Sequence, residues 1–253
     1  MVFSPHKLTI DPLPHIMIGT TELEWVGRGR REEAVRFLGV WLDDQFTFSN
    51  HITKLKAKLA SATYAIGACH INAPINIRKQ VYFSLFESLL RFGASLYGCA
   101  KLSLVNEIYV MQKDAIRRIS GSHYNSHTSP LFKRLEILKF HDLLDLERVS
   151  IVHKFKHHKL PDKFTNNFLK SIPEDKISIR HDLHSFTVPL ASEKFLTRAP
   201  TILMAITWNA LPFYIKSIAD HNDFKSEFKV LKLSGYQEDC ILPVCYTCNR
   251  NGN

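Results

Sequence analysis

The sequence is poor in the features that mark secreted and membrane proteins. No stretch of its 253 residues reaches the roughly eighteen uncharged apolar positions that a membrane-spanning helix needs. The first residues lack the apolar run of a signal peptide. Five cysteines, an odd number in a chain of this size, do not predict a disulfide framework. These absences predict an intracellular protein, cytoplasmic, nuclear or both, without a membrane partner.

Acidic residues are fewer than basic residues, and one long segment has none. The whole chain has 33 basic and 24 acidic side chains, a net charge of +9 and a pI near 9.3. Such a balance predicts a polyanionic partner, with nucleic acid ahead of an acidic membrane surface. No Asp or Glu occurs from Gln45 to Phe86, whereas five cations do: Lys54, Lys56, Lys58, Arg78 and Lys79. Since solvated faces normally mix both signs, we expect these cations to contact phosphates, with an ordinary solvated face as the alternative.

Motifs for catalysis and for metal binding are largely missing. There is no Gly-rich phosphate loop and no nucleophile elbow, and the thirteen histidines are scattered apart from one adjacent pair. The C-terminal tail has three cysteines at zinc-like spacing: Cys240, Cys245 and Cys248. A closed structural zinc site needs four ligands, and no His or Cys follows the third cysteine. We therefore predict free thiols that do not need zinc, and no cofactor in this chain.

One stretch near the N-terminus organises the rest. Residues 37–42 alternate with a period of two, which predicts a strand, and Asp43-Asp44-Gln45 has the composition of a turn. Phe46 and Phe48 would then begin a return strand, and Ser49 or Asn50 would cap a helix. Apolar residues at spacings of three and four predict the buried face of that helix: Ile52, Leu55, Leu59, Ala62 and Ile66.

Further elements follow on both sides. Residues 15–18 and 22–26 predict two short strands around Gly19-Thr20. Residues 75–98 predict a helix that is apolar on most sides and therefore central, with its aromatic rings in the core. A third helix is expected to end at Gly121. Three further helices are expected: one that starts at Ser129-Pro130, one over 142–159, and one that starts at Pro200. Weaker patterns suggest a short helix near Phe164 and Phe168, a strand pair within 177–190, and core positions for Trp208 and Phe224.

Several motifs in order resemble one family. They are Phe37-Leu38-Gly39-Val40, Leu42-Asp43, Thr47-Phe48-x-x-His51-Ile52, Met111-Gln112-Lys113-x-Ala115-Ile116-Arg117, His127-Thr128-x-Pro130-Leu131-Phe132, Trp208-Asn209-x-Leu211-Pro212 and Phe224-Lys225. They resemble the C-terminal portion of jockey-like, LINE-type non-LTR retrotransposon reverse transcriptases. The resemblance implies that the hairpin is the primer grip at the end of the palm, with primer-grip residues Phe37, Leu38 and Gly39. The helices after it would form the thumb.

The resemblance implies an α+β fold, mainly α, in four parts. Residues 1–50 would be a palm remnant with the hairpin, 51–121 a thumb-like bundle, 122–236 a C-terminal helical region, and 237–253 a Cys-containing tail. The whole family enzyme copies RNA into DNA with magnesium. Its metal-binding box pairs two aspartates after Tyr or Phe and Ala, whereas this chain has Trp41-Leu42-Asp43-Asp44 at the hairpin position. We therefore assign Asp43 and Asp44 a turn role and expect no catalytic residues.

The first functional hypothesis is thus a reverse transcriptase fragment that binds a primer–template duplex or RNA–DNA hybrid and does not polymerise alone. Its partners would be nucleic acid and the missing palm and fingers. The alternatives are a non-catalytic nucleic-acid-binding or interaction protein, and an inactive truncated copy of the element.

Overall fold

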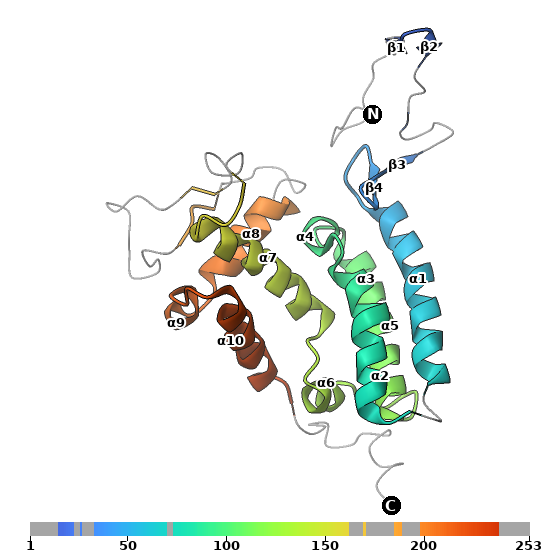
Figure 1. Ribbon diagram of the computed structural model, residues 1–253, viewed down its shortest axis with the longest axis vertical. Coiled ribbons are helices and arrows are strands. Elements are labelled where there is room, and N and C mark those ends of the chain that lie inside the picture. The colour runs from blue at the N-terminus through green and yellow to red at the C-terminus, as the bar shows by residue number, and fades with distance from the viewer. Residues whose placement is uncertain are drawn as a thin grey trace, which may run out of the picture.

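The computed structural model describes residues 15–22, 26, 33–69, 73–161, 169–170, 185–188 and 198–237. Two short antiparallel hairpins precede a set of packed helices, which confirms the predicted α+β, mainly α fold (Figure 1). The first hairpin pairs β1, Met17–Ile18, with β2, Thr21–Glu22, around Gly19 at a φ of +61°. The expected turn at Gly19 is therefore present.

The second hairpin forms in a different register from the one predicted. Strand β3, Ala34–Phe37, pairs with β4, Val40–Asp43, so that Phe37 lies opposite Val40. The turn is Leu38-Gly39, where both φ values are positive, +45° and +88°. Positive φ at both central residues is the geometry that lets a two-residue turn follow the twist of its strands. The predicted continuous strand over 37–42 was wrong because Gly39 supplies this turn.

The segment after β4 is a capped connection and not the predicted return strand. The Asp43 carboxylate accepts backbone N–H groups from Thr47 and Phe48, both at 2.8 Å, and from Gln45 at 3.2 Å. Phe46 and Phe48 have positive φ values, +51° and +57°, which no strand allows. The turn role of Asp43 is confirmed.

Helix α1, Ser49–Ala68, buries the predicted apolar stripe. Its N-cap residue is Phe48 without a side-chain cap, so the expected cap at Ser49 or Asn50 was wrong. Asp43 holds the turn that leads into the helix through the N–H groups of Thr47 and Phe48. The stripe packs on α5, Leu102–Ser120 (Figure 1). Gly121, at a φ of +68°, ends α5 as predicted.

The predicted central helix over 75–98 is divided into four pieces. They are α2, Ile75–Val81, a π-helical segment η1, Tyr82–Glu87, α3, Ser88–Arg91, and α4, Ala94–Tyr97. Gly93, at a φ of +72°, breaks the helix where a Cβ atom would meet Val40 Cγ2 at 3.0 Å.

The same segment packs on α1, α5 and α7 but leaves part of its surface exposed. Tyr82, Phe86 and Tyr97 are fully buried, as expected of core aromatics, but Phe83 and Phe92 are exposed. The prediction of a helix buried on most sides was therefore wrong in part. Exposed rings on this segment are available for contacts with other molecules.

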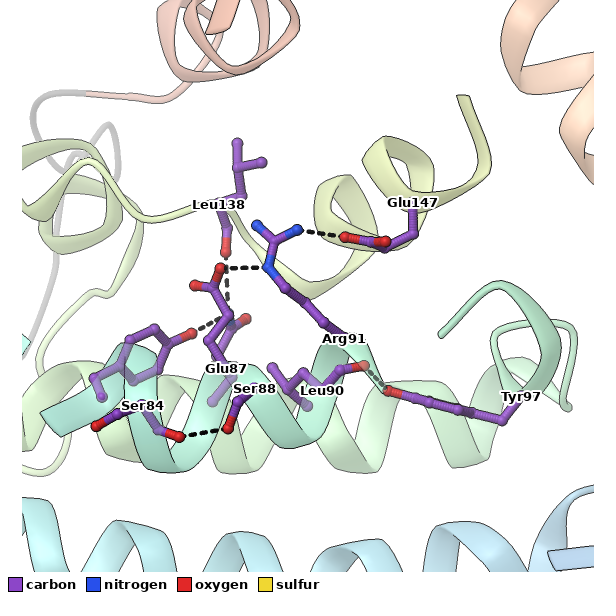
Figure 2. Close-up of polar contacts among 10 residues, drawn as sticks. Ser84, Glu87, Ser88, Leu90, Arg91, Tyr97, Leu138 and Glu147 are labelled. Atoms are coloured by element: carbon purple, nitrogen blue, oxygen red, sulfur yellow. Dashed lines mark hydrogen bonds and ion pairs between the residues drawn. The ribbon is translucent and has the colours of Figure 1, made fainter. Parts of the chain in front are cut away.

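A polar network connects this segment to α7, Phe140–Lys156. The Arg91 guanidinium donates to Glu87 at 2.8 Å and also to Glu147 of α7 (Figure 2). Burial raises the pKa of the Glu87 carboxyl, and the Arg91 charge opposes this shift. Gln112 of α5 donates to Tyr82 Oη and to the Leu138 carbonyl, and its Oε1 accepts the Phe140 N–H. Core contacts therefore cross the expected boundary at residues 121 and 122.

The C-terminal helices pack on α7. They are α8, Pro200–Asn209, α9, Phe213–Lys216, and α10, His221–Ser234. Helix α6, Ser129–Leu135, precedes α7 in the chain. Pro200 starts α8 as predicted, and Trp208 and Phe224 are fully buried with their rings stacked at 5.8 Å, which confirms them as core anchors. The expected helix near Phe164 and Phe168 lies outside the described residues. Most of the expected strand pair in 177–190 also lies outside the described residues, which include only 185–188 of that range.

Candidate nucleic-acid interface

A groove of about 620 Å³ opens between the β3–β4 hairpin, α1 and α3. Its wall combines cations with aromatic and aliphatic side chains, namely Arg36, Gly39, Trp41, His51, Lys54, Leu55, Ala57, Lys58, Leu89 and Phe92. None of these described lining residues is acidic. A groove of this composition suits a ligand with negative charge and flat apolar surfaces.

The cations and rings of the groove are positioned by local structure. Arg36 and Trp41 are cross-strand partners in the hairpin. The Lys54 ammonium lies 4.2 Å from the centre of the Trp41 ring, a cation–π contact. Lys58 follows Lys54 by one helical turn and is likewise exposed. Two lysines of α1 and one hairpin arginine therefore concentrate positive charge along one edge.

The floor of the groove is neutral. His51 is buried, and its Nδ1 accepts the Trp41 N–H at 3.4 Å. Burial, and to a lesser degree the charge of Lys58, lower the pKa of His51. The imidazole therefore holds the hairpin to α1 in its neutral form, and the charge of the groove comes from Arg36, Lys54 and Lys58.

The expected primer-grip residues form the tip of the hairpin beside this groove. Phe37 is 61% exposed and Leu38 is 80% exposed. Gly39 packs so closely on Phe92 that a Cβ atom there would lie 2.9 Å from Phe92 Cε1. The tip thus presents apolar side chains next to the cations of α1.

The five cations of the acid-free window do not form one surface. Lys54 and Lys58 line the groove, whereas Lys56 pairs with Glu107 of α5. Lys79 lies 3.6 Å from Glu136, at the end of α6. A window that lacks acids in the sequence therefore meets acids from other helices in space.

Arg78 also lies away from the groove. Its Nη1 donates to the Arg118 carbonyl at 3.4 Å, near the end of α5. The groove instead includes Arg36, Trp41 and Phe92, which the sequence reasoning did not select as ligand contacts. The cross-strand position of Arg36, next to an aromatic residue, is the one signal that could have indicated it.

Within the described ranges, no three His, Cys, Asp or Glu side chains are grouped to hold a metal ion. Cys240, Cys245 and Cys248 lie outside those ranges. No helix in the described part of the chain is long and apolar enough to cross a membrane.

Comparison with known proteins points to one group of enzymes. The chain is 31% identical over 132 residues, 48% of its length, to the RNA-directed DNA polymerase from mobile element jockey of Drosophila melanogaster. It is 25% identical over 141 residues, 54% of its length, to the jockey polymerase of Drosophila funebris. This chain is similar to non-LTR retrotransposon polymerases. The resemblance predicted from the sequence motifs is thereby confirmed.

A third polymerase relative agrees with the first two. It is the probable RNA-directed DNA polymerase from transposon X-element of Drosophila melanogaster, 21% identical over 129 residues, 50% of this chain. The matched segments span 14% to 15% of the length of these polymerases. No family model matches the chain, and no solved structure matches it.

Proposed function

We propose that this chain is the part of a non-LTR retrotransposon reverse transcriptase that grips a nucleic-acid duplex by its backbone. The observation that carries the proposal is the groove between the hairpin and α1. Arg36, Lys54 and Lys58 lie along it, and its described lining residues include no carboxylate. A duplex backbone carries a dense row of phosphates, so such an edge attracts it whatever its base sequence.

The exposed rings fit the same ligand. Phe37 at the hairpin tip and Phe92 at the groove would contact sugars or a terminal base, which bind aromatic faces without strong sequence preference. The names of the polymerase relatives suggest an RNA–DNA hybrid as the natural duplex. We propose that the chain contributes binding and needs no cofactor of its own, with magnesium held by carboxylates elsewhere in the enzyme.

The test is the salt dependence of affinity for an RNA–DNA hybrid. Each phosphate neutralised by a cation contributes about 0.9 to the slope of log affinity against log salt. Lys54→Gln/Lys58→Gln should therefore flatten the slope by about 1.8. Lys56→Gln should change it less, because Glu107 already pairs with that lysine.

A matched control removes two lysines elsewhere. Lys154 and Lys159 are exposed near the end of α7, far along the chain from the groove. Lys154→Gln/Lys159→Gln makes the same charge change and should leave the slope at the parent value. Equal slopes for the parent and the groove variant would show that Lys54 and Lys58 are only a solvated helix face.

A further inference from the structure

A second group of cations lies at the other end of α1. The last turns of α2, α5 and α6 each contain two. We call this group the far-end cluster: Arg78, Lys79, Arg117, Arg118, Lys133 and Arg134. Among the described contacts, Asp114 pairs with Arg118 at 2.9 Å and Glu136 pairs with Lys79 at 3.6 Å. The gathering of six cationic side chains makes this end of the helices basic.

Contacts with α1 show that the far-end cluster lies near the C-terminal end of that helix. The Arg118 guanidinium packs on Gly67, where a Cβ atom would lie 2.8 Å from Nη1. Arg78 in turn donates to the Arg118 carbonyl. Lys54 precedes Gly67 by thirteen positions, and at about 1.5 Å per residue this is roughly 20 Å along the helix.

Helix ends alone do not explain these cations. Basic residues in a last helical turn often do no more than offset the helix dipole. That reason fails for Arg78 and Lys79, because α2 continues directly into η1 and then α3 without a helix end.

Arg78 also has an unused donor. Among the described residues its buried Nε has no hydrogen-bond partner. The Lys79–Glu136 pair is long and exposed on the Glu136 side, so it holds Lys79 weakly. The Lys79 ammonium is therefore available to an anionic ligand, whereas the Arg78 Nε is enclosed.

We propose that the far-end cluster is a second backbone-binding surface for the duplex held at the groove. The inference rests on the proposed function and extends it, because it gives the duplex a footprint. A separation of roughly 20 Å corresponds to about six base-pair steps of 3.4 Å. Two protected backbone segments, about six base pairs apart, should therefore mark the bound duplex.

The experiment uses the full chain and an RNA–DNA hybrid longer than this footprint. Because Asp114 already pairs with Arg118, Arg118→Gln/Arg134→Gln should flatten the salt slope by at least the contribution of Arg134, about 0.9, and adding Lys54→Gln/Lys58→Gln should flatten it by at least about 2.7 in total. Hydroxyl-radical footprinting should show loss of one protected segment in each double variant. Arg118→Lys/Arg134→Lys keeps the charges and should keep the parent slope.

Asp114 offers a matched structural control. Asp114→Asn breaks the same ion pair as Arg118→Gln but makes the surface more positive. If the cluster binds phosphate, Asp114→Asn should bind as tightly as the parent or more tightly, with its slope retained. Equal weakening by Asp114→Asn and Arg118→Gln would mean that the ion pair acts only on folding, and would overturn the inference.

The two proposals fail in different ways. A parent slope in Arg118→Gln/Arg134→Gln, together with a flattened slope in Lys54→Gln/Lys58→Gln, overturns the second surface and leaves the groove in place. A parent chain that does not bind the hybrid overturns the proposed function, and the second surface with it.

Discussion

The hairpin region and the α7–α8–α10 region use aromatic side chains in opposite ways. Near the hairpin, Phe37 is 61% exposed and Phe92 is 55% exposed. In the C-terminal helices, Trp208, Phe224 and Phe228 have no exposed surface. Rings left in solvent do not stabilise a fold, whereas buried rings account for much of its stability. The contrast agrees with the binding proposed for the first region, and the buried rings of the second stabilise the packing of its helices.

Cations differ between the two regions in the same way. In the C-terminal helices, Lys216 is buried and donates to the Asn209 carbonyl at 3.0 Å. Lys232 of α10 pairs with Asp142 and Asp145 of α7. These lysines connect helices to one another, whereas Lys54 and Lys58 line an open groove. A basic composition therefore identifies a binding surface only after the partners of each cation are known.

The largest expected effect tests the stability side of this contrast. Trp208→Ala should lower the free energy of unfolding by about 4 kcal/mol, because it empties the space between Phe186 and Phe224. Phe92→Ala removes a ring that is already half exposed and should cost less than about 1 kcal/mol. Urea unfolding measures both values, and similar losses for the two variants would contradict the contrast.

A smaller effect is expected at the junction of hairpin and α1. Asp43→Ala removes the acceptor of three backbone N–H groups and should cost about 2 kcal/mol, because partly buried donors lose their partner. Urea unfolding checks this value, and Asp44→Ala is the neighbouring control, expected to cost less. Equal costs would show that the carboxylate of Asp43 has no special part in the turn.

A further effect is expected in acid, namely a loss of stability located in the C-terminal helices. His153 Nε2 donates to the Ile218 carbonyl at 2.9 Å, so its Nδ1 is free to accept from His221 Nδ1 at 3.1 Å. This arrangement requires the His153 ring to be neutral, because its Nδ1 accepts while its Nε2 donates. Burial is the main reason that the pKa values of both are lowered, that of His221 to about 4. His157, whose pKa is also lowered by burial, stacks against His153.

The direction in which stability changes with pH follows from proton binding. Between about pH 6.5, the ordinary histidine pKa, and about pH 4, the unfolded chain binds more protons than the folded chain. The stability from neutral His221 is therefore complete above this window and is lost as the pH falls through it. Nearby cations act in the same direction, namely Lys154, Lys156, Lys159 and Lys225, while Asp220 is engaged at the start of α10.

The measurement is urea unfolding at a series of pH values across that window. His221→Phe keeps a ring against Phe224 and removes the titrating group, so its stability should fall less in acid than that of the parent. Parallel pH profiles for the two proteins would show that His221 does not contribute.

Local patterns were sufficient for several features. The apolar stripe of α1, the end of α5 at Gly121, the start of α8 at Pro200 and the burial of Trp208 were predicted and confirmed. Each depends on spacing or backbone preference within a few residues, which a sequence displays directly. The motifs that resemble reverse transcriptases belong here too, since the polymerase relatives confirm them.

Two predictions failed because the deciding contacts come from elsewhere. Both Gly39 and Asp43 can form turns, and the sequence does not rank them. In the structure Gly39 lies against Phe92, and Val40 lies close to Gly93, which selects the turn at Leu38-Gly39. The segment over 75–98 is apolar on most sides, but only tertiary packing decides which of these sides are covered.

The amino-acid sequence by itself determined several helices, the buried face of α1, the excess of positive charge and the family resemblance, because these depend on local spacing and composition. The tertiary structure decided where that charge lies and which acids stand beside it. Glu107 and Glu136, distant in the sequence, pair with Lys56 and Lys79. Folding also brings Arg36 and Phe92 to the same groove as Lys54. Electrostatic and packing interactions act through space, so a window of sequence without acids becomes two separate basic surfaces only when the helices pack.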